Sequence, residues 1–273
     1  MSSDRLYAPT PDLRIVNTAS LLPHEIHDSQ RALPLIERLQ SESYMINPPV
    51  VAPLEGDQFI ILDGANRCHA FQALDYPHML VQVVTYESGL VELETWNHVI
   101  GRWSESILIA QLNQLPDIEI LQGQHARAIA HVLTRSQDIL ALCAAVDNAH
   151  ERNEALCKVV DIYQKNAALH RTTLSEPEEI WPMFPDSAAV LFFRHYQPAD
   201  IVAAAKYQAW LPPGISRHIV HGRALRVNYP MTLLKDEQVS LQDKNEALKH
   251  WMREKLAHRQ IRYYAEATYQ FDE

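Results

Sequence analysis

The stretch IILDGANR at residues 60–67 decides the fold expected for the first part of the chain. Its β-branched and leucine residues are typical of a buried strand, and Asp63-Gly64 directly after them is a turn signal. Residues 65–74 then have a helical composition. A helix that begins directly after a strand presents unpaired backbone N–H groups and the positive end of its dipole, so this corner is a natural place to bind an anion.

Elements on both sides of the corner complete a compact module. The runs PVVAP and QFIIL flank Glu55-Gly56-Asp57, which predicts a hairpin whose second strand leads into the corner. Apolar residues recur at helical spacing upstream, and β-branched runs mark the outer strands. The further elements predicted are a strand at 13–16, a helix at 29–41 and a strand at 80–84.

The remainder of the chain shows a different pattern. Residues 101–175 contain no convincing strand, and 128–146 and 151–168 have helical composition. Beyond Pro177 the pattern predicts a strand at 188–193 and helices at 198–209 and 240–258. We therefore expect an α+β protein with three parts: an N-terminal module at 1–100, a helical segment at 101–175, and a mixed α/β part at 176–273.

Composition places the chain among ordinary globular proteins. It has 273 residues, of which 47% are apolar, enough for one large domain or two modest ones. The formal net charge of −10 works against the phosphate attraction on which most DNA-binding proteins depend. The basic stretch at 249–262 is most simply an amphipathic helix with a solvated face.

Targeting and redox signals are also absent from the sequence. No signal-peptide pattern and no run near eighteen apolar residues occurs, so we expect no membrane span and a cytoplasmic location. Cys68, Cys143 and Cys157 have no zinc-site spacing, which favours reduced, structural thiols.

The residue types at the corner suit a phosphate site, although an Asp-Gly after a strand is usually only a turn. Gly64 permits backbone conformations closed to other residues, and Asn66 offers an amide. Arg67 can donate two hydrogen bonds to a phosphate, and the Asp63 carboxylate is a suitable ligand for Mg²⁺ bridging phosphate oxygens.

With DGANRCHAFQALDYPHMLVQVV at this place, the chain resembles the ParB-like (ParB/sulfiredoxin) superfamily, whose members carry Asp-Gly-x-His-Arg or a variant there. Asn66 replaces the usual histidine, so a role for a titrating imidazole is in doubt. Sulfiredoxins place their reactive cysteine where this chain has Ala65. Partitioning proteins add a helix-turn-helix domain and basic surfaces, which the acidic composition disfavours.

The branch of free L-serine kinases matches best. Its motifs are similar to Pro23-His24-Glu25, Thr95-Trp96 and Ser216-Arg217-His218 in this chain. The runs YQP at 196–198, LPPGISR at 211–217, GR at 222–223 and PMTLLK at 230–235 also look like the serine kinases of siderophore (staphyloferrin B type) biosynthesis loci. The resemblance covers nearly the whole chain, and the middle segment matches poorly.

This resemblance implies roles for individual residues. Glu25 would accept the proton of the serine hydroxyl as general base, and Asp63 would act in catalysis by binding Mg²⁺. Nucleotide-binding residues would be Asp63, Gly64, Ala65, Asn66, Arg67 and Arg31, and substrate-binding residues Thr95, Trp96, Ser216, Arg217 and His218. Without the resemblance, Glu25 and Arg31 are typical surface residues, Trp96 typical core, and His24 and His218 typical structural histidines.

The expected function is therefore phosphoryl transfer from ATP or ADP to free L-serine, giving O-phospho-L-serine, with Mg²⁺ as cofactor. The sequence leaves the choice of ATP or ADP and the oligomeric state open. The alternative is a ParB-like, nucleotide-dependent DNA-binding regulator, motivated by the same corner and by the basic C-terminal stretch.

Overall fold

The computed structural model describes residues 9–27, 29–146 and 148–264, which form two compact units. Of the described residues, unit 1 contains 9–23, 27, 29–92 and 218–264, and unit 2 contains 24–26, 93–146 and 148–217. Both units combine sheets and helices, so the fold is mixed α/β. The expected borders near residues 100 and 175 do not coincide with the borders of these units. The proposed three-part division therefore stays a prediction.

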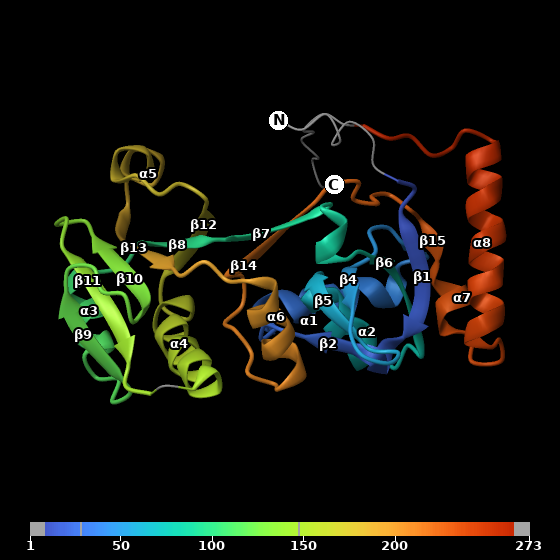
Figure 1. Ribbon diagram of the computed structural model, residues 1–273. Helices are drawn as coiled ribbons and strands as arrows, with labels where there is room; N and C mark the ends of the chain where they lie inside the picture. Colours follow the sequence, from blue (N-terminus) through green and yellow to red (C-terminus); the bar gives the residue numbers. More distant parts are fainter. Residues whose placement is uncertain (1–8, 28, 147, 265–273) are drawn as a thin grey trace. The chain divides into compact units, whose positions relative to one another are not determined.

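Unit 1 is built on a mixed five-stranded sheet with the order β1-β6-β4-β5-β2 (Figure 1). Its β4–β5 hairpin is antiparallel, whereas β2 runs parallel to β5 and β4 runs parallel to β6. The strands of this sheet are β1 (Asp12–Asn17), β2 (Leu21–Pro23), β4 (Val50–Pro53), β5 (Phe59–Asp63) and β6 (His78–Val83). A separate pair is formed by β3 (Tyr44–Met45) and β15 (Tyr229–Pro230), and short 3-10 helices lie at Thr18–Ser20 and Tyr86–Ser88. The helices are α1 (Ser29–Ser41), α2 (Ala65–Ala73), α7 (Met231–Lys235) and α8 (Leu241–Ala257).

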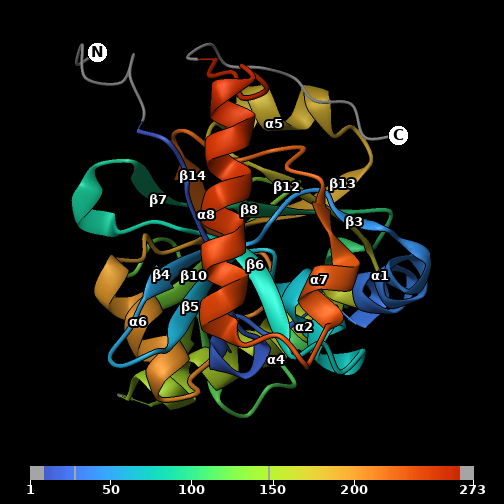
Figure 2. The same cartoon turned by 90° about the vertical axis from the view of Figure 1, so that its right-hand side faces the viewer.

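The long C-terminal helix α8 covers the outer edge of this sheet, and Figure 2 shows it in front of the strands. Strand β1 pairs with β6 on one side only. On its other side the Asn245 side chain accepts a hydrogen bond from the Ile15 N–H at 2.9 Å and donates to the Ile15 carbonyl at 2.8 Å. The amide thus replaces a missing neighbouring strand and protects an edge that would otherwise be open.

Unit 2 is built on a six-stranded antiparallel sheet with the order β12-β8-β13-β10-β11-β9. Its strands are β8 (Asn97–Gly101), β9 (Ile118–Gln122), β10 (Ala128–Thr134), β11 (Ile139–Ala144), β12 (Ala168–Thr172) and β13 (Ser187–Phe193). The helices are α3 (Glu105–Leu112), α4 (Ala149–Gln164), α5 (Pro177–Met183) and α6 (Pro198–Lys206). Two further paired strands, β7 (Val91–Thr95) and β14 (Ser216–Val220), carry the chain from one unit to the other.

The prediction of a helical middle segment was wrong. The run at 128–146, predicted as a helix, is the hairpin of β10 and β11, and β9 and β12 also fall in this part of the chain. Each hairpin strand pairs on both sides, and most of its residues are buried on both faces. Its sequence is therefore mostly apolar and shows no regular alternation. Such a run cannot be distinguished from a buried helix by periodicity.

The other elements predicted here agree with the structure. Strand β13 and helices α6 and α8 lie where they were predicted, and α4 covers most of the helix expected at 151–168. In unit 1 the hairpin, the helices at 29–41 and 65–73 and the outer strands were all predicted correctly. No helix in the described ranges is long and apolar enough to cross a membrane.

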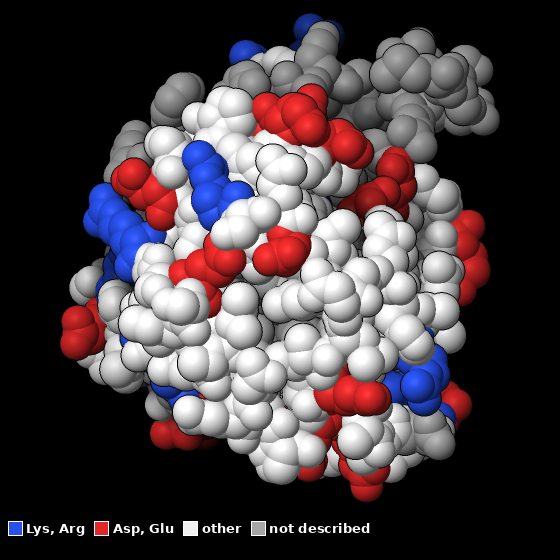
Figure 3. All heavy atoms as spheres, turned by 90° about the vertical axis from the view of Figure 1, so that its left-hand side faces the viewer, with Lys and Arg blue, Asp and Glu red and all other residues white. Residues whose placement is uncertain are grey.

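Charged side chains are scattered over the face shown in Figure 3. The blue Lys and Arg side chains lie in separated positions among red Asp and Glu side chains and larger uncharged areas. This distribution agrees with the acidic composition of the chain.

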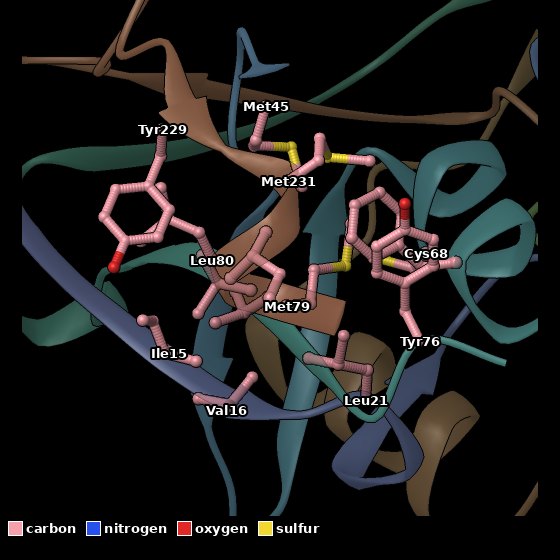
Figure 4. Packing of buried hydrophobic residues seen from close by; sticks show 14 of the residues in the cluster. Ile15, Val16, Leu21, Met45, Cys68, Tyr76, Met79, Leu80, Tyr229 and Met231 are labelled. Atoms are coloured by element: carbon pink, nitrogen blue, oxygen red, sulfur yellow. The ribbon is translucent and has the colours of Figure 1, made fainter. Parts of the chain in front are cut away.

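The core of unit 1 lies beside the strand-to-helix corner (Figure 4). Met79 and Leu80 of β6 are completely buried at its centre, and Cys68 and Phe71 of α2 pack into it. Cys68, Cys143 and Cys157 form no disulfide. Burial raises the pKa of the Cys68 thiol to about 12, so this cysteine acts as a small apolar residue and holds α2 against the sheet.

Candidate active site

The strand-to-helix corner, residues 63–67, has the geometry expected from the sequence. Strand β5 ends at Asp63 and helix α2 begins at Ala65. Between them Gly64 has φ +95°, in the left-handed region that favours glycine. A Cβ at this position would lie 3.0 Å from the Cβ of Pro49, so both conformation and space require glycine.

The N-terminus of α2 lies at this corner. Gly64 has no side chain with which to cap the helix, and the first N–H groups of a helix have no acceptor four residues earlier. Asn66 and Arg67 lie in the first turn and are half-buried. Burial lowers the pKa of the Arg67 guanidinium while the nearby Asp63 carboxylate raises it, so a cation is held here partly out of water. The structure thus brings the five predicted corner residues together.

Arg223 is a member of this corner that the residue assignments from the sequence missed. Its guanidinium pairs with the Asp63 carboxylate at 2.5 Å, and its Nε is buried with no hydrogen-bond partner among the described residues. The side chain of Gln82 in β6 holds the backbone on both sides of Arg223, because it donates to the Gly222 carbonyl at 3.0 Å and accepts from the Ala224 N–H at 2.8 Å. The Gly222-Arg223 pair was noticed in the sequence, but only the structure places it beside Asp63.

Asp63 suits a Mg²⁺ ion that arrives with a nucleotide. Mg²⁺ is commonly held by one or two carboxylates together with phosphate oxygens and water. Asp63 offers one half-exposed carboxylate, and no group of three or more metal-ligating side chains occurs in the described ranges. The donor set therefore fits a metal whose remaining ligands come from phosphates and water.

The second candidate site is the Glu25 cluster in unit 2, which consists of Glu25, His24, Gly214 and Ser216. Backbone hydrogen bonds on both sides of Glu25 tie it to Leu211, since Leu211 N–H donates to the His24 carbonyl and Ile26 N–H to the Leu211 carbonyl, each at 2.9 Å. The Glu25 Oε2 accepts from the Gly214 N–H at 2.8 Å. Its Oε1 accepts from the Ser216 N–H at 2.9 Å and the Ser216 hydroxyl at 2.5 Å.

Glu25 is ionised in this setting. Burial alone would raise its pKa, but the hydrogen bond and charge of His24 and the donors of Ser216 and Gly214 outweigh burial and lower the pKa to about 2. His24 was expected to be structural, yet its Nε2 lies 2.7 Å from the Ser216 hydroxyl and 3.6 Å from the Glu25 carboxylate. In the sequence, only the position of His24 next to Glu25 indicated that it belongs to this cluster.

The predicted substrate-binding residues divide between the units. In unit 2 the Arg217 guanidinium lies over the Trp96 ring, 4.6 Å from its centre. The backbone N–H of Trp96 donates to the carbonyl of Ile215, the neighbour of Ser216, at 2.8 Å. The Thr95 hydroxyl donates to the Arg194 carbonyl at 3.4 Å. His218 belongs to unit 1, where its Nε2 lies 2.8 Å from the Tyr86 hydroxyl. Arg31 falls within α1, and its side chain lies outside the described part of the structure.

Comparison with known proteins gives these two sites a context. No model of a known protein family matches the sequence. The chain is 21% identical over 263 residues to the ATP-dependent L-serine kinase SbnI of Staphylococcus aureus, a match that covers 94% of this chain and 96% of that protein. An ATP-dependent L-serine kinase of Staphylothermus marinus is 31% identical over 83 residues, or 30% of this chain. This second match spans only 33% of the relative's length.

Solved structures of such kinases resemble the chain over most of its length. A C-terminally truncated SbnI from Staphylococcus aureus has a TM-score of 0.73 at 16% identity and covers 89% of this chain and 97% of that one. A free serine kinase in complex with AMP has a TM-score of 0.72 at 15% identity and covers 83% of this chain and 95% of that one. The fold is that of these L-serine kinase structures.

Proposed function

We propose that the protein is a free L-serine kinase that transfers the terminal phosphoryl group of ATP to the hydroxyl of L-serine and releases O-phospho-L-serine. The observation that carries the proposal is the nearly full-length similarity to an L-serine kinase, which spans both candidate sites. ATP and a free amino acid are cytoplasmic metabolites, so we place the reaction in the cytoplasm.

The strand-to-helix corner is the nucleotide site in this proposal, and it would be part of a ParB-like module. Backbone N–H groups from Gly64 to Asn66 would hold phosphate oxygens, whereas the Arg67 N–H donates to the Gly64 carbonyl at 3.0 Å. The side chains of Arg67 and Arg223 would add positive charge. Asp63 would hold Mg²⁺ once the phosphates are bound, which requires Arg223 to move from the carboxylate to a phosphate oxygen. The metal would neutralise charge that develops on the phosphates. Arg31 is a further proposed nucleotide contact.

Glu25 is the proposed proton acceptor. The serine oxygen forms a bond to the terminal phosphorus, the bond from that phosphorus to the ADP oxygen breaks, and the hydroxyl proton passes to the Glu25 carboxylate. A carboxylate has about four acceptor positions, and the donors of Gly214 and Ser216 occupy three of them. The substrate hydroxyl can use the remaining position on Oε2 or displace the Ser216 hydroxyl from Oε1.

The low pKa of Glu25 determines which role the carboxylate could have in phosphoryl transfer. At a pKa of about 2 the carboxylate is a weak base towards a free alcohol. Phosphoryl transfer has a loose transition state that asks mainly for positioning, and the serine oxygen becomes acidic as it bonds to phosphorus. Glu25 would therefore orient the hydroxyl first and take its proton late.

The remaining proposed contacts recognise the amino acid. Arg217 and His218 would bind the serine carboxylate or the new phosphate, and Trp96 would form a wall of the pocket. Ser216 and Thr95 offer hydroxyl groups for hydrogen bonds to the substrate's polar groups.

The direct test is product formation by the full-length protein. We expect O-phospho-L-serine, detected by ³¹P nuclear magnetic resonance and mass spectrometry, from L-serine, ATP and Mg²⁺, and no product after chelation of the metal. ADP in place of ATP tests the second donor. Absence of phosphoserine from folded protein that binds ATP would refute the proposal.

Matched substitutions separate the two sites. Gly64→Ala should weaken ATP binding by roughly tenfold or more through loss of charge-assisted hydrogen bonds, whereas Gly56→Ala, at φ +69° with open space around it, should leave affinity unchanged. Glu25→Gln should lower kcat by about 10²-fold or more with ATP affinity retained. Glu94→Gln, an exposed position of the same unit, is its control.

A further inference from the structure

A buried chain of hydrogen bonds leads from helix α4 to the Glu25 carboxylate. The Tyr163 hydroxyl lies 2.8 Å from Nδ1 of His98, and Nε2 of His98 lies 3.0 Å from the Gly214 carbonyl oxygen. The Gly214 N–H then donates to Glu25 Oε2 at 2.8 Å. Tyr163 and His98 are both completely buried, and all four residues belong to unit 2.

The direction of each hydrogen bond follows from the chemistry of the groups. A carbonyl oxygen only accepts, so Nε2 of His98 carries a hydrogen and donates to Gly214. In a neutral imidazole the other nitrogen is then an acceptor, and the Tyr163 hydroxyl donates to it. Burial lowers the pKa of His98 to about 4 and raises that of Tyr163 well above its ordinary value, which keeps the imidazole neutral and the hydroxyl protonated at neutral pH. The Gly214 carbonyl therefore selects the tautomer of His98, and the Tyr163 hydroxyl satisfies the remaining nitrogen of the ring.

The segment 213–216 is held at three successive carbonyl groups by residues other than Glu25. The Arg171 guanidinium donates to the Pro213 carbonyl at 3.5 Å, and His98 donates to the Gly214 carbonyl. The backbone N–H of Trp96 donates to the Ile215 carbonyl at 2.8 Å. The N–H groups of residues 214 and 216 point instead to the two oxygens of Glu25. The Gly214 N–H shares a peptide with the Pro213 carbonyl, and the Ser216 N–H shares one with the Ile215 carbonyl, so fixing these two carbonyl groups fixes the donors to Glu25. His98 holds the Gly214 carbonyl between them and limits rotation at Gly214.

The backbone conformation at Gly214 favours glycine. Gly214 has φ +75°, and a Cβ there would lie 1.9 to 2.3 Å from guanidinium atoms of Arg171. The close approach of Arg171 and the contact with His98 leave the peptide little freedom.

We propose that His98 and Tyr163 are positioning residues, which hold the Gly214 carbonyl and so limit backbone rotation at Gly214, keeping the Gly214 N–H directed at the carboxylate of Glu25. The inference rests on the proposed kinase function, in which Glu25 receives the substrate hydroxyl. Neither residue touches substrate or nucleotide, so both act only through Gly214.

Kinetics of three substitutions in the full-length protein test the chain. His98→Leu removes the donor to Gly214 and should lower kcat about tenfold or more. Tyr163→Phe leaves Nδ1 of the buried His98 without its donor, so the ring is held less firmly, and should lower kcat about 2- to 10-fold. His98→Gln keeps a donor at the place of Nε2 and should restore kcat to within about threefold of the parent protein. The KM for ATP should not change, because the nucleotide is bound by other residues.

A titration of Glu25 tests the same link without catalysis. In protein labelled with ¹³C at glutamate carboxyl groups, with the Glu25 signal assigned by Glu25→Gln, we expect the Glu25 pKa to rise in His98→Leu towards the ordinary value of 4.5. The acid limb of the pH profile of kcat should move to higher pH together with the Glu25 pKa. A role that is only structural would lower stability and leave this titration where it is.

Controls and outcomes decide between the possibilities. Two control substitutions change residues that take no part in this chain of hydrogen bonds. They are His131→Gln on β10, at a half-buried position, and Tyr229→Phe in unit 1, at a buried position, and they should change neither kcat nor the Glu25 titration. If folded His98→Leu titrates and turns over like the parent protein, the inference is overturned. If His98→Leu does not fold, Tyr163→Phe and His98→Gln decide by the same measurements. If the parent protein makes no phosphoserine, the kinase proposal fails while the Glu25 titration still tests the positioning chain.

Discussion

At the scale of single residues, Glu25 is distinguished by the number of donors directed at it. Two backbone N–H groups, a hydroxyl and His24 all favour its charged form and overcome the effect of burial. The same contacts that keep the carboxylate ionised also tie residues 24–26 to the segment 213–216. A residue proposed for catalysis is therefore also a structural link within unit 2.

Glu25 should make the stability of the protein depend on pH in the acid range. Its folded pKa of about 2 lies below the ordinary value of 4.5, so its contribution is fully present above pH 4.5 and is lost as pH falls towards 2. The pH-dependent part is on the order of 3 kcal/mol. Urea unfolding between pH 7 and pH 3 should show that the parent protein loses stability as pH falls. The slope of the free energy of unfolding against pH should be smaller in Glu25→Gln. Equal slopes would contradict the prediction.

A side chain at Gly214 should destabilise the protein. Gly214→Ala combines left-handed backbone strain with overlap of Arg171 and should lower the free energy of unfolding by about 2–4 kcal/mol. Gly123→Ala, at φ +84° in the same unit with no atom within 4 Å of the added Cβ, isolates the backbone effect at about 1 kcal/mol. Thermal unfolding of both variants gives the comparison, and similar losses in the two would argue against the clash.

At the scale of elements, α8 shows why a basic helix need not bind nucleic acid. Leu248 is buried in the core of unit 1 and Trp251 packs against it. The Lys244 ammonium is buried and donates to the Leu234 carbonyl at 3.1 Å. One face of the helix is thus used within its own unit, and basic and acidic residues alternate on the rest.

Asn245 should be the most sensitive polar position of α8. Asn245→Leu leaves the N–H and carbonyl of Ile15 without their partners and should cost about 2–4 kcal/mol in the free energy of unfolding. Gln242→Ala, an exposed change on the same helix, should stay within about 0.5 kcal/mol of the parent protein. Denaturant unfolding monitored by circular dichroism measures both. A loss in Asn245→Leu no larger than in the control would mean that water satisfies the edge of β1.

At the scale of the whole molecule, the charge of −10 opposes DNA binding. We expect no shift of a labelled DNA duplex by the full-length protein with ATP, even at about 50 mM salt, where electrostatic binding is strongest. A salt-sensitive shift that disappears when Lys249 and Arg253 are replaced by Ala would instead support the nucleotide-dependent regulator.

The sequence by itself determined the local elements around residues 60–67, because strand, turn and helix signals there agree with one another and with the buried pattern. It also pointed to Glu25 and the corner through their motifs. The hairpin of β10 and β11 was not predictable in this way, since strands buried on both faces have no periodicity that separates them from a helix. Only the tertiary structure placed Arg223 beside Asp63, and His98, Tyr163 and Gly214 in line with Glu25, because these contacts join residues between 65 and 189 positions apart whose side chains have no signal of their own.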